Sequence, residues 1–304
     1  METKKYKQPA PLKEGDLIAI CSPAGPVKDE NVLAAAKVLE QQGWRVKIMP
    51  HALGRYGIYA ASDADRLADM KDALTDPEVR AVLCSRGGYG VVHILEELDR
   101  LDLDADPKWI IGYSDISALH ALATRQGLNS IHASMTAQIK LGPDDAANSM
   151  LFAILRGEKP VLTFPTSPLY DRQGIATGRL VGGNLAVIAD LVGTRFDVIE
   201  PGVILFIEDI SEPIYKIERM LYQLRMSGVL AKLGGLVVGQ FTEYKPDKSY
   251  AKMEDMIRDM VAPYNYPVAF NAPIGHVGFN MPVIENATVT LKVTNSANNS
   301  IIYW

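Results

Sequence analysis

Short apolar runs alternate with amphipathic segments along the first half of the chain. The runs have the length and composition of buried strands, and they cover residues 16–21, 44–49, 79–84, 109–111 and 128–133. The segments between them carry an apolar face at helical spacing or are rich in Ala and Leu, which predicts helices at 29–42, 63–74, 91–98 and 116–125. Strands that alternate with helices predict an α/β fold, a flavodoxin-like parallel sheet with helices on both faces.

The pattern changes in the middle of the chain. Four prolines fall in a stretch with one predicted helix, near 146–156, and such a stretch is typical of a linker between domains. The second half combines a strong helix at 214–226 with strands expected at 174–181, 203–207, 236–240, 268–271, 287–293 and 300–304. The sequence therefore predicts an N-terminal α/β domain at 1–160 and a smaller, mixed β/α domain at 170–304.

Ser114 lies where the strand at 109–111 gives way to the helix at 116–125, in the run WIIGYSDIS. A tight strand-to-helix turn exposes a side chain at the sheet edge and directs the N–H groups of the first helical turn toward it. A serine nucleophile that builds an oxyanion needs both features. The run matches the nucleophile elbow G-x-S-x-G only in its first glycine, because Ile116 stands at the second. On this segment alone, a helix cap by Ser114 or Asp115 is the simpler interpretation.

Two further loops, SPAGPV at 22–27 and SRGGYG at 85–90, also follow predicted parallel strands. All three loops therefore share the carboxyl edge of the sheet, where ligands bind in folds of this class. The glycines of SRGGYG allow the backbone to approach a bound group and to donate N–H groups to an oxyanion or a phosphate. Arg86 in this loop either holds a substrate carboxylate through two hydrogen bonds or lies solvated at the surface.

A serine nucleophile needs a base, and the chain has five histidines. His93 and His120 fall inside predicted helices, where packed or exposed residues without a catalytic role are more common. His51 and His132 lie at a strand end or in a loop and stay open as candidates. His276 in NAPIGHVGFN lies between two glycines after a strand, where a loop can present an imidazole.

The third member of such a site is a carboxylate that orients the base. Acidic residues follow the apolar strand at 203–207, and an acid in that position usually has a partner. The pattern alone does not separate Glu208, Asp209 and Glu212. The structural alternative is a salt bridge that precedes the next helix, from one of these acids to Lys216 or Arg219.

Composition narrows the class of protein. The 304-residue chain is 48% hydrophobic and 22% charged, and its net charge of -5 argues against a nucleic-acid or polybasic membrane surface. No apolar run is long enough to span a bilayer, and METKKYKQPAPLKEGD at the N-terminus lacks the apolar core of a signal peptide, so we expect a cytoplasmic protein. Cys21 and Cys84 are too few for a disulfide framework or a zinc site and are expected to be buried thiols.

Motifs along nearly the whole chain together resemble the L,D-carboxypeptidase family of serine peptidases, which includes the microcin-immunity peptidases. In chain order they are GDLIAICSPAGP, the run 62–66 before DPEVRAVLCSRGGYG, IIGYSDIS, GGNL, LFIEDISEPIYKIERMLYQLRMSG and PIGH. The resemblance implies a triad of Ser114 as nucleophile, Glu208 as orienting carboxylate and His276 as base. It also implies that the backbone N–H groups of Gly88 and Asp115 form the oxyanion hole.

The reaction implied by this resemblance is hydrolysis of the amide bond between an L-centre and a terminal D-residue. Its typical substrate is the murein tetrapeptide, which loses D-alanine during cell-wall recycling in the cytoplasm. The microcin-type branch cleaves peptidyl-nucleotide analogues instead. We therefore expect a small peptide substrate and a homodimer, with no nucleic-acid or membrane partner and no metal or other cofactor.

Two alternatives from other functional classes stay open. A non-catalytic, two-lobed ligand-binding protein would keep the pocket and tolerate the loss of His276 or Glu208. A nucleotide-binding transferase or kinase would use GGYG as a phosphate loop, but such a loop would need an acidic residue or a lysine beside its glycines. Arg86 and Tyr89 flank them here, which counts against the kinase.

Overall fold

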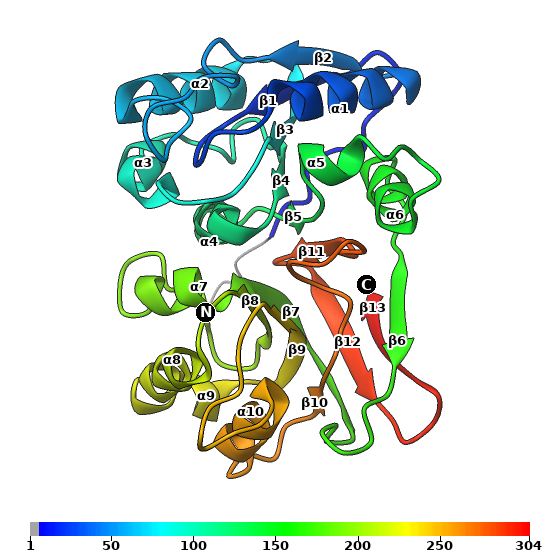
Figure 1. The fold of residues 1–304 in the computed structure, drawn as a ribbon. Helices are drawn as coiled ribbons and strands as arrows, with labels where there is room; N and C mark the ends of the chain where they lie inside the picture. The colour runs from blue at the N-terminus through cyan, green and yellow to red at the C-terminus, as the bar shows by residue number, and fades with distance from the viewer. Residues whose placement is uncertain (1–5) are drawn as a thin grey trace. The chain divides into compact units, whose positions relative to one another are not determined.

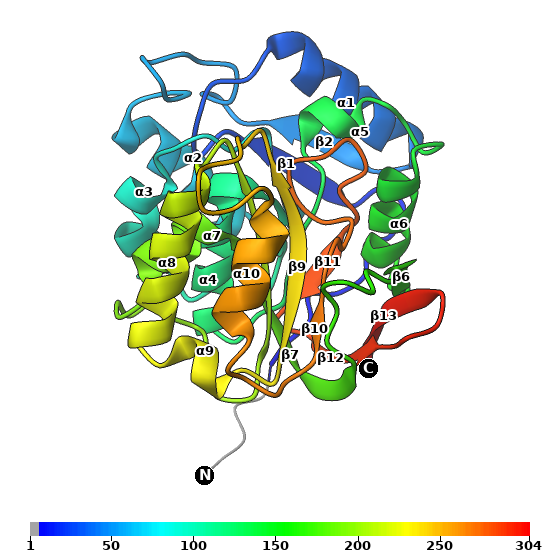
Figure 2. The ribbon, with the colours of Figure 1, turned by 60° about the horizontal axis from the view of Figure 1, so that its bottom comes forward.

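A computed structural model describes residues 6–304, so the start of the N-terminal segment lies outside the described residues. The chain divides into two compact units. The N-terminal unit comprises Met1–Lys159 and Met281–Asn286, and the C-terminal unit comprises Pro160–Asn280 and Ala287–Trp304. Each unit is built around a sheet of its own (Figure 1; Figure 2).

The N-terminal unit contains a six-stranded sheet in the order β11-β5-β4-β3-β1-β2. Strands β1 to β5 are parallel, and their order 2-1-3-4-5 is that of flavodoxin-like folds. They are β1 Leu17–Cys21, β2 Arg45–Ile48, β3 Val79–Cys84, β4 Trp109–Gly112 and β5 Ser130–His132. The α/β class and the parallel sheet predicted from the apolar runs are therefore confirmed.

Helices cover both faces of this sheet (Figure 1). On one face α1 (Asp29–Gln41) packs against the short α5 (Thr136–Ile139), and α6 (Ala146–Leu155) follows in the chain. On the other face α2 (Asp63–Thr75), α3 (Val91–Leu98) and α4 (Ser117–Arg125) pack in a row. Because both faces are covered, a strand such as β1 is buried along its whole length, which explains its uninterrupted apolar run.

Strand β11 (Val283–Glu285) departs from the simple division at 160–170 that the sequence suggests. It comes late in the chain, yet it pairs antiparallel with β5 and closes one edge of the N-terminal sheet. Its three residues are buried. A strand this short leaves almost no periodic signal, and its place depends on a partner far away in sequence.

The C-terminal unit contains a mixed, seven-stranded sheet in the order β10-β9-β8-β7-β12-β13-β6. Strands β7 to β10 are parallel, whereas β12, β13 and β6 extend the sheet antiparallel from β7. The strands are β6 Val161–Pro165, β7 Gly174–Asn184, β8 Ile204–Ile210, β9 Gly235–Thr242, β10 Val268–Ala269, β12 Thr288–Val293 and β13 Asn298–Tyr303. The predicted mixed β/α class of this unit is confirmed.

The helices of the C-terminal unit pack on the parallel part of its sheet. They are α7 Leu185–Leu191, α8 Ile214–Met226, α9 Val229–Lys232 and α10 Met253–Val261. Their apolar faces form one core with the inner residues of β7, β8 and β9. Strand β6 lies at the opposite edge of the sheet, where its proline disturbs no neighbour. No helix among residues 6–304 has the length and apolar character needed to cross a membrane.

Candidate functional site

Ser114 begins a short 3-10 turn, η1 (Ser114–Ile116), between β4 and α4. Its backbone φ of 68° is in the left-handed region, which is uncommon for a residue with a side chain. Such a conformation costs about 1–3 kcal/mol and persists only where the surrounding structure enforces it. Ser114 is partly exposed, whereas Tyr113 and Asp115 on either side are buried. The turn thus holds the Ser114 side chain away from the apolar core that its neighbours join.

The carboxylate of Asp115 caps a helix, although not the one that its own segment begins. Its Oδ2 accepts a hydrogen bond of 2.9 Å from the N–H of Val91, the first residue of α3. Burial raises the pKa of Asp115 to about 6, while the bond from Val91 and the charges of Arg66 and His93 act in the opposite direction. A helix cap was expected from Ser114 or Asp115, and Asp115 is the residue that provides one. The hydrogen bond from Val91 ties the serine turn to the start of α3.

The glycine loop after β3 lies directly against the serine turn. A Cβ atom at Gly87 would lie 2.6 Å from the Cβ of Ser114 and 3.3 Å from the backbone nitrogen of Asp115, so only glycine fits there. Gly88 has a φ of 120° and approaches the backbone of Gly25. Among the backbone hydrogen bonds of the described residues, none uses the N–H of Gly88 or of Asp115. Two donors with no other partner are what an oxyanion hole requires.

Arg66 holds this loop in place from a buried position in α2. Its guanidinium donates to the carbonyl oxygens of Pro23 and Gly90, one in each of the loops that follow β1 and β3. A further hydrogen bond of 3.0 Å joins the same two loops, from the N–H of Gly25 to the carbonyl of Gly87. The sequence carries no signal for this role of Arg66, because a lone arginine in a predicted helix normally faces solvent.

Glu208 and His276 form a hydrogen-bonded pair in the C-terminal unit. Glu208 lies in β8 and is fully buried, and His276 lies in the loop that follows β10. The Nδ1–H of His276 donates to Oε2 of Glu208 at 2.7 Å. This bond assigns the hydrogen to Nδ1 and leaves Nε2 as the nitrogen that can accept a proton from a nucleophile.

The electrostatics of the pair make His276 a stronger base than an isolated imidazole. Burial by itself would lower the pKa of His276, but the hydrogen bond and charge of Glu208 outweigh it, helped by Asp209 and Glu243. The net effect is a pKa raised above its ordinary value. A raised pKa favours transfer of a proton to the imidazole.

Two glycines let the loop that carries His276 approach Glu208. A Cβ atom at Gly275 would lie 2.8 Å from the Cβ of Glu208, and one at Gly239 in β9 would lie 2.6 Å from the carbonyl oxygen of Ile274. Gly275 also has a φ of 125°, which other residues rarely adopt. Its N–H donates to the side chain of Asn280 at 2.8 Å, which fixes the turn.

The structure separates the three acids that the sequence leaves together. Glu208 pairs with His276, whereas Asp209 accepts hydrogen bonds at the start of α7, from the N–H of Ala186 and the side chain of Asn184. Glu212 forms an ion pair of 3.3 Å with Lys216 one turn later. The ion-pair alternative thus applies to Glu212, because it lies past the end of the strand.

His120, His132 and His93 lie in packed or ion-paired environments of the N-terminal unit. His120 is fully buried, with Nδ1 2.8 Å from the Ser130 hydroxyl and Nε2 2.9 Å from the carbonyl oxygen of Gly112. The position of His120 in its helix predicts that it faces away from the serine turn. Its ring instead contacts the backbone of Gly112, the last residue of β4. His132 is buried in β5, and His93 lies beside Asp63.

A second histidine–carboxylate pair, missed in the sequence, lies in the N-terminal unit. The ring of His51 is 2.8 Å from Asp69, and the same carboxylate also accepts from the backbone N–H of His51. The double contact anchors the loop after β2 to α2.

Burial raises the pKa of both Cys21 and Cys84, so neither thiol is a ready nucleophile.

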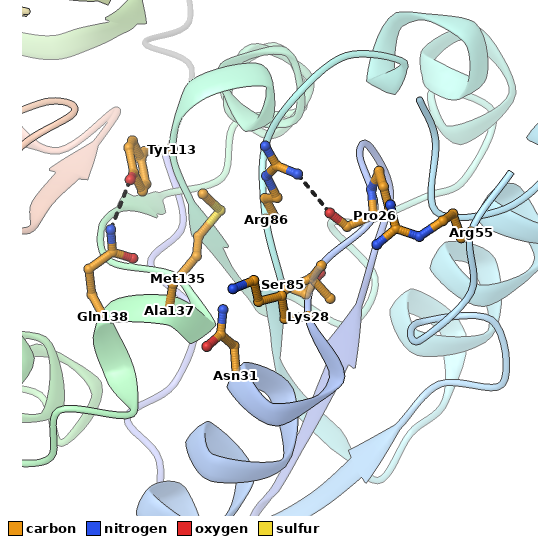
Figure 3. A pocket seen from close by; sticks show the side chains of 11 residues that line it. Pro26, Lys28, Asn31, Arg55, Ser85, Arg86, Tyr113, Met135, Ala137 and Gln138 are labelled. Carbon is orange, nitrogen blue, oxygen red and sulfur yellow. Dashed lines mark hydrogen bonds between the residues drawn. The ribbon is translucent and has the colours of Figure 1, made fainter. Parts of the chain in front are cut away.

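Arg86 is exposed and lies at a pocket of the N-terminal unit (Figure 3). Its guanidinium donates to the carbonyl oxygen of Pro26 at 2.8 Å. The role of Arg86 in holding a carboxylate stays a prediction.

Among residues 6–304, no group of three or more His, Cys, Asp or Glu side chains is arranged to hold a metal ion.

Ser114 belongs to the N-terminal unit, and Glu208 and His276 belong to the C-terminal unit. Comparison with known proteins identifies the family. A model of the LD-carboxypeptidase N-terminal domain matches residues 18–133, and a model of the LD-carboxypeptidase C-terminal domain matches residues 177–291. The chain belongs to the LD-carboxypeptidase family. The predicted family is thereby confirmed, and membership makes the chain a peptidase.

Relatives of the LD-carboxypeptidase family cover nearly the whole chain. The murein tetrapeptide carboxypeptidase of Pseudomonas aeruginosa is 32% identical over 284 residues, 90% of this chain and 92% of that protein. The crystal structure of muramoyltetrapeptide carboxypeptidase from Oxalobacter formigenes is 28% identical, with a TM-score of 0.86 over 94% of this chain and 98% of that one.

Microcin C7 self immunity protein MccF, solved with aspartyl sulfamoyl adenosine, is 20% identical to this chain. Its TM-score is 0.83, over 96% of this chain and 97% of that one. At this identity the likeness shows a shared fold. The two carboxypeptidase relatives support carboxypeptidase activity for the chain.

Proposed function

We propose that the chain is a serine L,D-carboxypeptidase that removes D-alanine from the murein tetrapeptide. The observation that carries the proposal is the 2.7 Å hydrogen bond between His276 and the fully buried Glu208. A carboxylate that is fully buried, and bonded to one nitrogen of an imidazole, is the arrangement that orients a general base. The relatives named for murein tetrapeptide and muramoyltetrapeptide support the choice of substrate.

In this proposal Ser114, Glu208 and His276 act as one triad. Nε2 of His276 takes the proton of the Ser114 hydroxyl as its oxygen attacks the scissile carbonyl. Glu208 keeps the hydrogen on Nδ1 and stabilises the imidazolium that forms. The imidazolium then returns the proton to the amine of D-alanine, which leaves, and a water molecule hydrolyses the acyl-enzyme by the same route in reverse.

The negative oxygen that forms during attack would be held by the N–H groups of Gly88 and Asp115. Each donor of this kind contributes about 100- to 1,000-fold in rate. Arg86 would bind the terminal carboxylate of the peptide and so restrict the reaction to chain ends. A cytoplasmic location and a homodimer belong to the same proposal.

Active-site labelling together with a release assay tests the proposal. A fluorophosphonate should label the native protein and fail to label Ser114→Ala, and native protein should release D-alanine from murein tetrapeptide. His276→Ala should abolish both labelling and release. Labelling that persists in Ser114→Ala would exclude this nucleophile. Labelling without release of D-alanine, together with cleavage of a peptidyl-nucleotide analogue, would favour the microcin-type reaction, and binding without either reaction would indicate a binding protein.

A further inference from the structure

A fully buried histidine connects the two ends of the serine turn. His120 lies in α4, the helix that follows this turn, and α4 packs on β4 and β5 (Figure 1). Its Nε2 is 2.9 Å from the carbonyl oxygen of Gly112, which ends β4 two residues before Ser114. The contact therefore joins the strand that enters the turn to the helix that leaves it.

The partners of His120 determine which ring nitrogen carries the hydrogen. A carbonyl oxygen can only accept, so the Nε2–H of His120 donates to Gly112. Nδ1 then accepts from the hydroxyl of Ser130 in β5, at 2.8 Å. The carboxyl group of Glu285 lies 3.9 Å from Nε2, too far away to replace Gly112 as the acceptor. Burial lowers the pKa of His120 to about 4, against the opposing effect of the bond to Gly112, so the ring is a neutral donor at neutral pH.

Packing and hydrogen-bond satisfaction do not by themselves require a histidine at this position. The carbonyl oxygen of Gly112 already accepts a hydrogen bond of 3.1 Å from the N–H of Ala133, so it would be paired without His120. Most residues of α4 are apolar and buried, Leu119 and Leu122 among them, and an apolar side chain there would avoid the desolvation of a polar ring. The bond from His120 thus restrains Gly112 rather than satisfying an unpaired carbonyl.

Gly112 is packed closely enough for this restraint to reach Ser114. A Cβ atom at Gly112 would lie 2.9 Å from the side chain of Ile116 and 3.2 Å from the Cβ of Cys84, the last residue of β3. Only Tyr113 separates Gly112 from Ser114 in the chain, and consecutive Cα atoms stay about 3.8 Å apart. The left-handed backbone of Ser114 persists only where its surroundings enforce it, so a shift at Gly112 would move the serine.

We propose that His120 is a positioning residue for the nucleophile, because its imidazole holds the carbonyl of Gly112 and so fixes the turn from which Ser114 attacks. The proposal rests on the serine carboxypeptidase function proposed above. His120 contacts no substrate in this role, and its ring takes up no proton during the reaction. Ser130 supports it, because its hydroxyl bonds to Nδ1 and keeps the hydrogen of the ring on Nε2.

Two amide variants of His120 separate the bond to Gly112 from the bond to Ser130. The amide nitrogen of glutamine is as many bonds from Cβ as Nε2 of histidine is, so His120→Gln keeps a donor for Gly112. The amide of asparagine corresponds to Nδ1 instead, so His120→Asn keeps an acceptor for Ser130 and loses the donor to Gly112. The melting temperature of each variant reports its loss of stability.

The measured quantities are kcat and KM for D-alanine release and the rate of fluorophosphonate labelling. We expect kcat and the labelling rate of His120→Asn to fall together by about 100-fold, as for a misplacement near 1 Å at a reacting group. KM should stay within about threefold of native, because the groups that bind the substrate are unchanged. His120→Gln should be at least about tenfold more active than His120→Asn, because it keeps the bond that positions the turn.

Lys108→Met is the matched control for the loss of a buried donor. Lys108 directly precedes β4 and is buried, and its ammonium group donates to the carbonyl oxygens of Asp76 and Val79 at 2.9 and 2.8 Å. The change therefore removes buried hydrogen bonds at the end of β4 that is remote from Ser114. It should lower the melting temperature and leave kcat within about threefold of native.

Equal activity of His120→Gln and His120→Asn would overturn the proposal, since the donor to Gly112 would then have no effect on the serine. A kcat of His120→Asn within about threefold of native would overturn it too. So would a loss of kcat in Lys108→Met as large as that in His120→Asn, because lost stability would then explain both.

Ser130→Ala tests the same point if neither variant of His120 folds. It keeps the imidazole and removes the hydroxyl that orients it, so kcat should fall by about five- to tenfold, and an unchanged kcat would overturn the proposal. Failure of the carboxypeptidase function is recognised separately. Native protein would then neither release D-alanine nor react with the fluorophosphonate, and the role of His120 would fall with that function.

Discussion

Gly87 allows the loop after β3 to touch Ser114, and we predict that Gly87→Ala inactivates the enzyme while the fold survives. The new Cβ atom would lie 2.6 Å from the Cβ of Ser114 and 2.8 Å from its hydroxyl oxygen, whereas ordinary contacts begin at 3.4 Å. The loop or the serine must therefore move by about 0.8 Å. A misplacement near 1 Å at a reacting group costs about 100-fold in rate. Movement of the loop would also displace the N–H of Gly88, the proposed oxyanion donor, and loss of a donor of this kind costs about 100- to 1,000-fold in rate.

The assay compares kcat/KM for D-alanine release with the rate of fluorophosphonate labelling and with the melting temperature. We expect kcat/KM and the labelling rate of Gly87→Ala to fall together by at least about 100-fold. Crowding of this kind destabilises a protein by about 1–3 kcal/mol, and each kcal/mol lowers the melting temperature of a unit this size by about 2–4 °C. The variant should therefore still be folded at 25 °C.

Gly15→Ala is the matched control for the loss of stability. Gly15 has a φ of 82°, so alanine is strained there, but its Cβ atom would meet nothing within 4 Å. We expect it to lose about 1–2 kcal/mol through backbone strain and to keep its activity. If Gly87→Ala retained kcat/KM within about threefold of the native value, the reasoning would be refuted. Ser114 would then react in a position that does not depend on the glycine loop.

Three further predictions concern charges at the two candidate pairs and at the serine turn. The pKa of His276 is raised above its ordinary value of 6.5, and the imidazole must be neutral to act as a base. A plot of kcat/KM against pH should therefore rise with a midpoint above 6.5. Glu208→Gln should move this midpoint to lower pH and should lower kcat/KM on the plateau at higher pH. His51→Ala should keep D-alanine release within a few-fold of native while His276→Ala abolishes it, and the reverse result would move the base to the other histidine–carboxylate pair. The pKa of Asp115 rises to about 6 on folding, so its contribution to stability is complete below about pH 4 and is lost as pH rises through 6. The free energy of unfolding should be measured for native protein and for Asp115→Asn by chemical unfolding from pH 4 to 7. The native protein should lose stability relative to Asp115→Asn as the pH rises.

The N-terminal unit could be predicted well because of where its strands lie. Strands buried on both faces leave continuous apolar runs, and the helices between them keep one apolar face, so both periods are visible in the sequence. The serine turn follows from the same pattern, because it is the junction between the run at 109–111 and the next helix. Its left-handed φ and the close approach of Gly87 were not visible, since both depend on packing between two loops.

Glu208 and Asp209 in β8, and Glu212 just after it, show which assignments the sequence pattern cannot make. Successive residues of a strand point to opposite sides, so Glu208 and Asp209 cannot both face His276. Which of them does so depends on contacts with the loop at 274–276, far along the chain, and spacing does not reveal it. Strands β6 and β11 were missed for a related reason, because short strands gain their stability from distant partners.

The strained conformation of Ser114 is maintained by several independent contacts rather than by one. Arg66 connects the loops after β1 and β3, the N–H of Gly25 bonds to Gly87, and the carboxylate of Asp115 ties the serine turn to the start of α3. A single contact worth about 1 kcal/mol would not hold a backbone conformation that costs about 1–3 kcal/mol. Several contacts that each fix a different loop can do so, and they fix the glycine N–H groups at the same time. Two buried polar side chains thus fix this region: Asp115 ties down the serine turn itself, and Arg66 joins the two loops beside it.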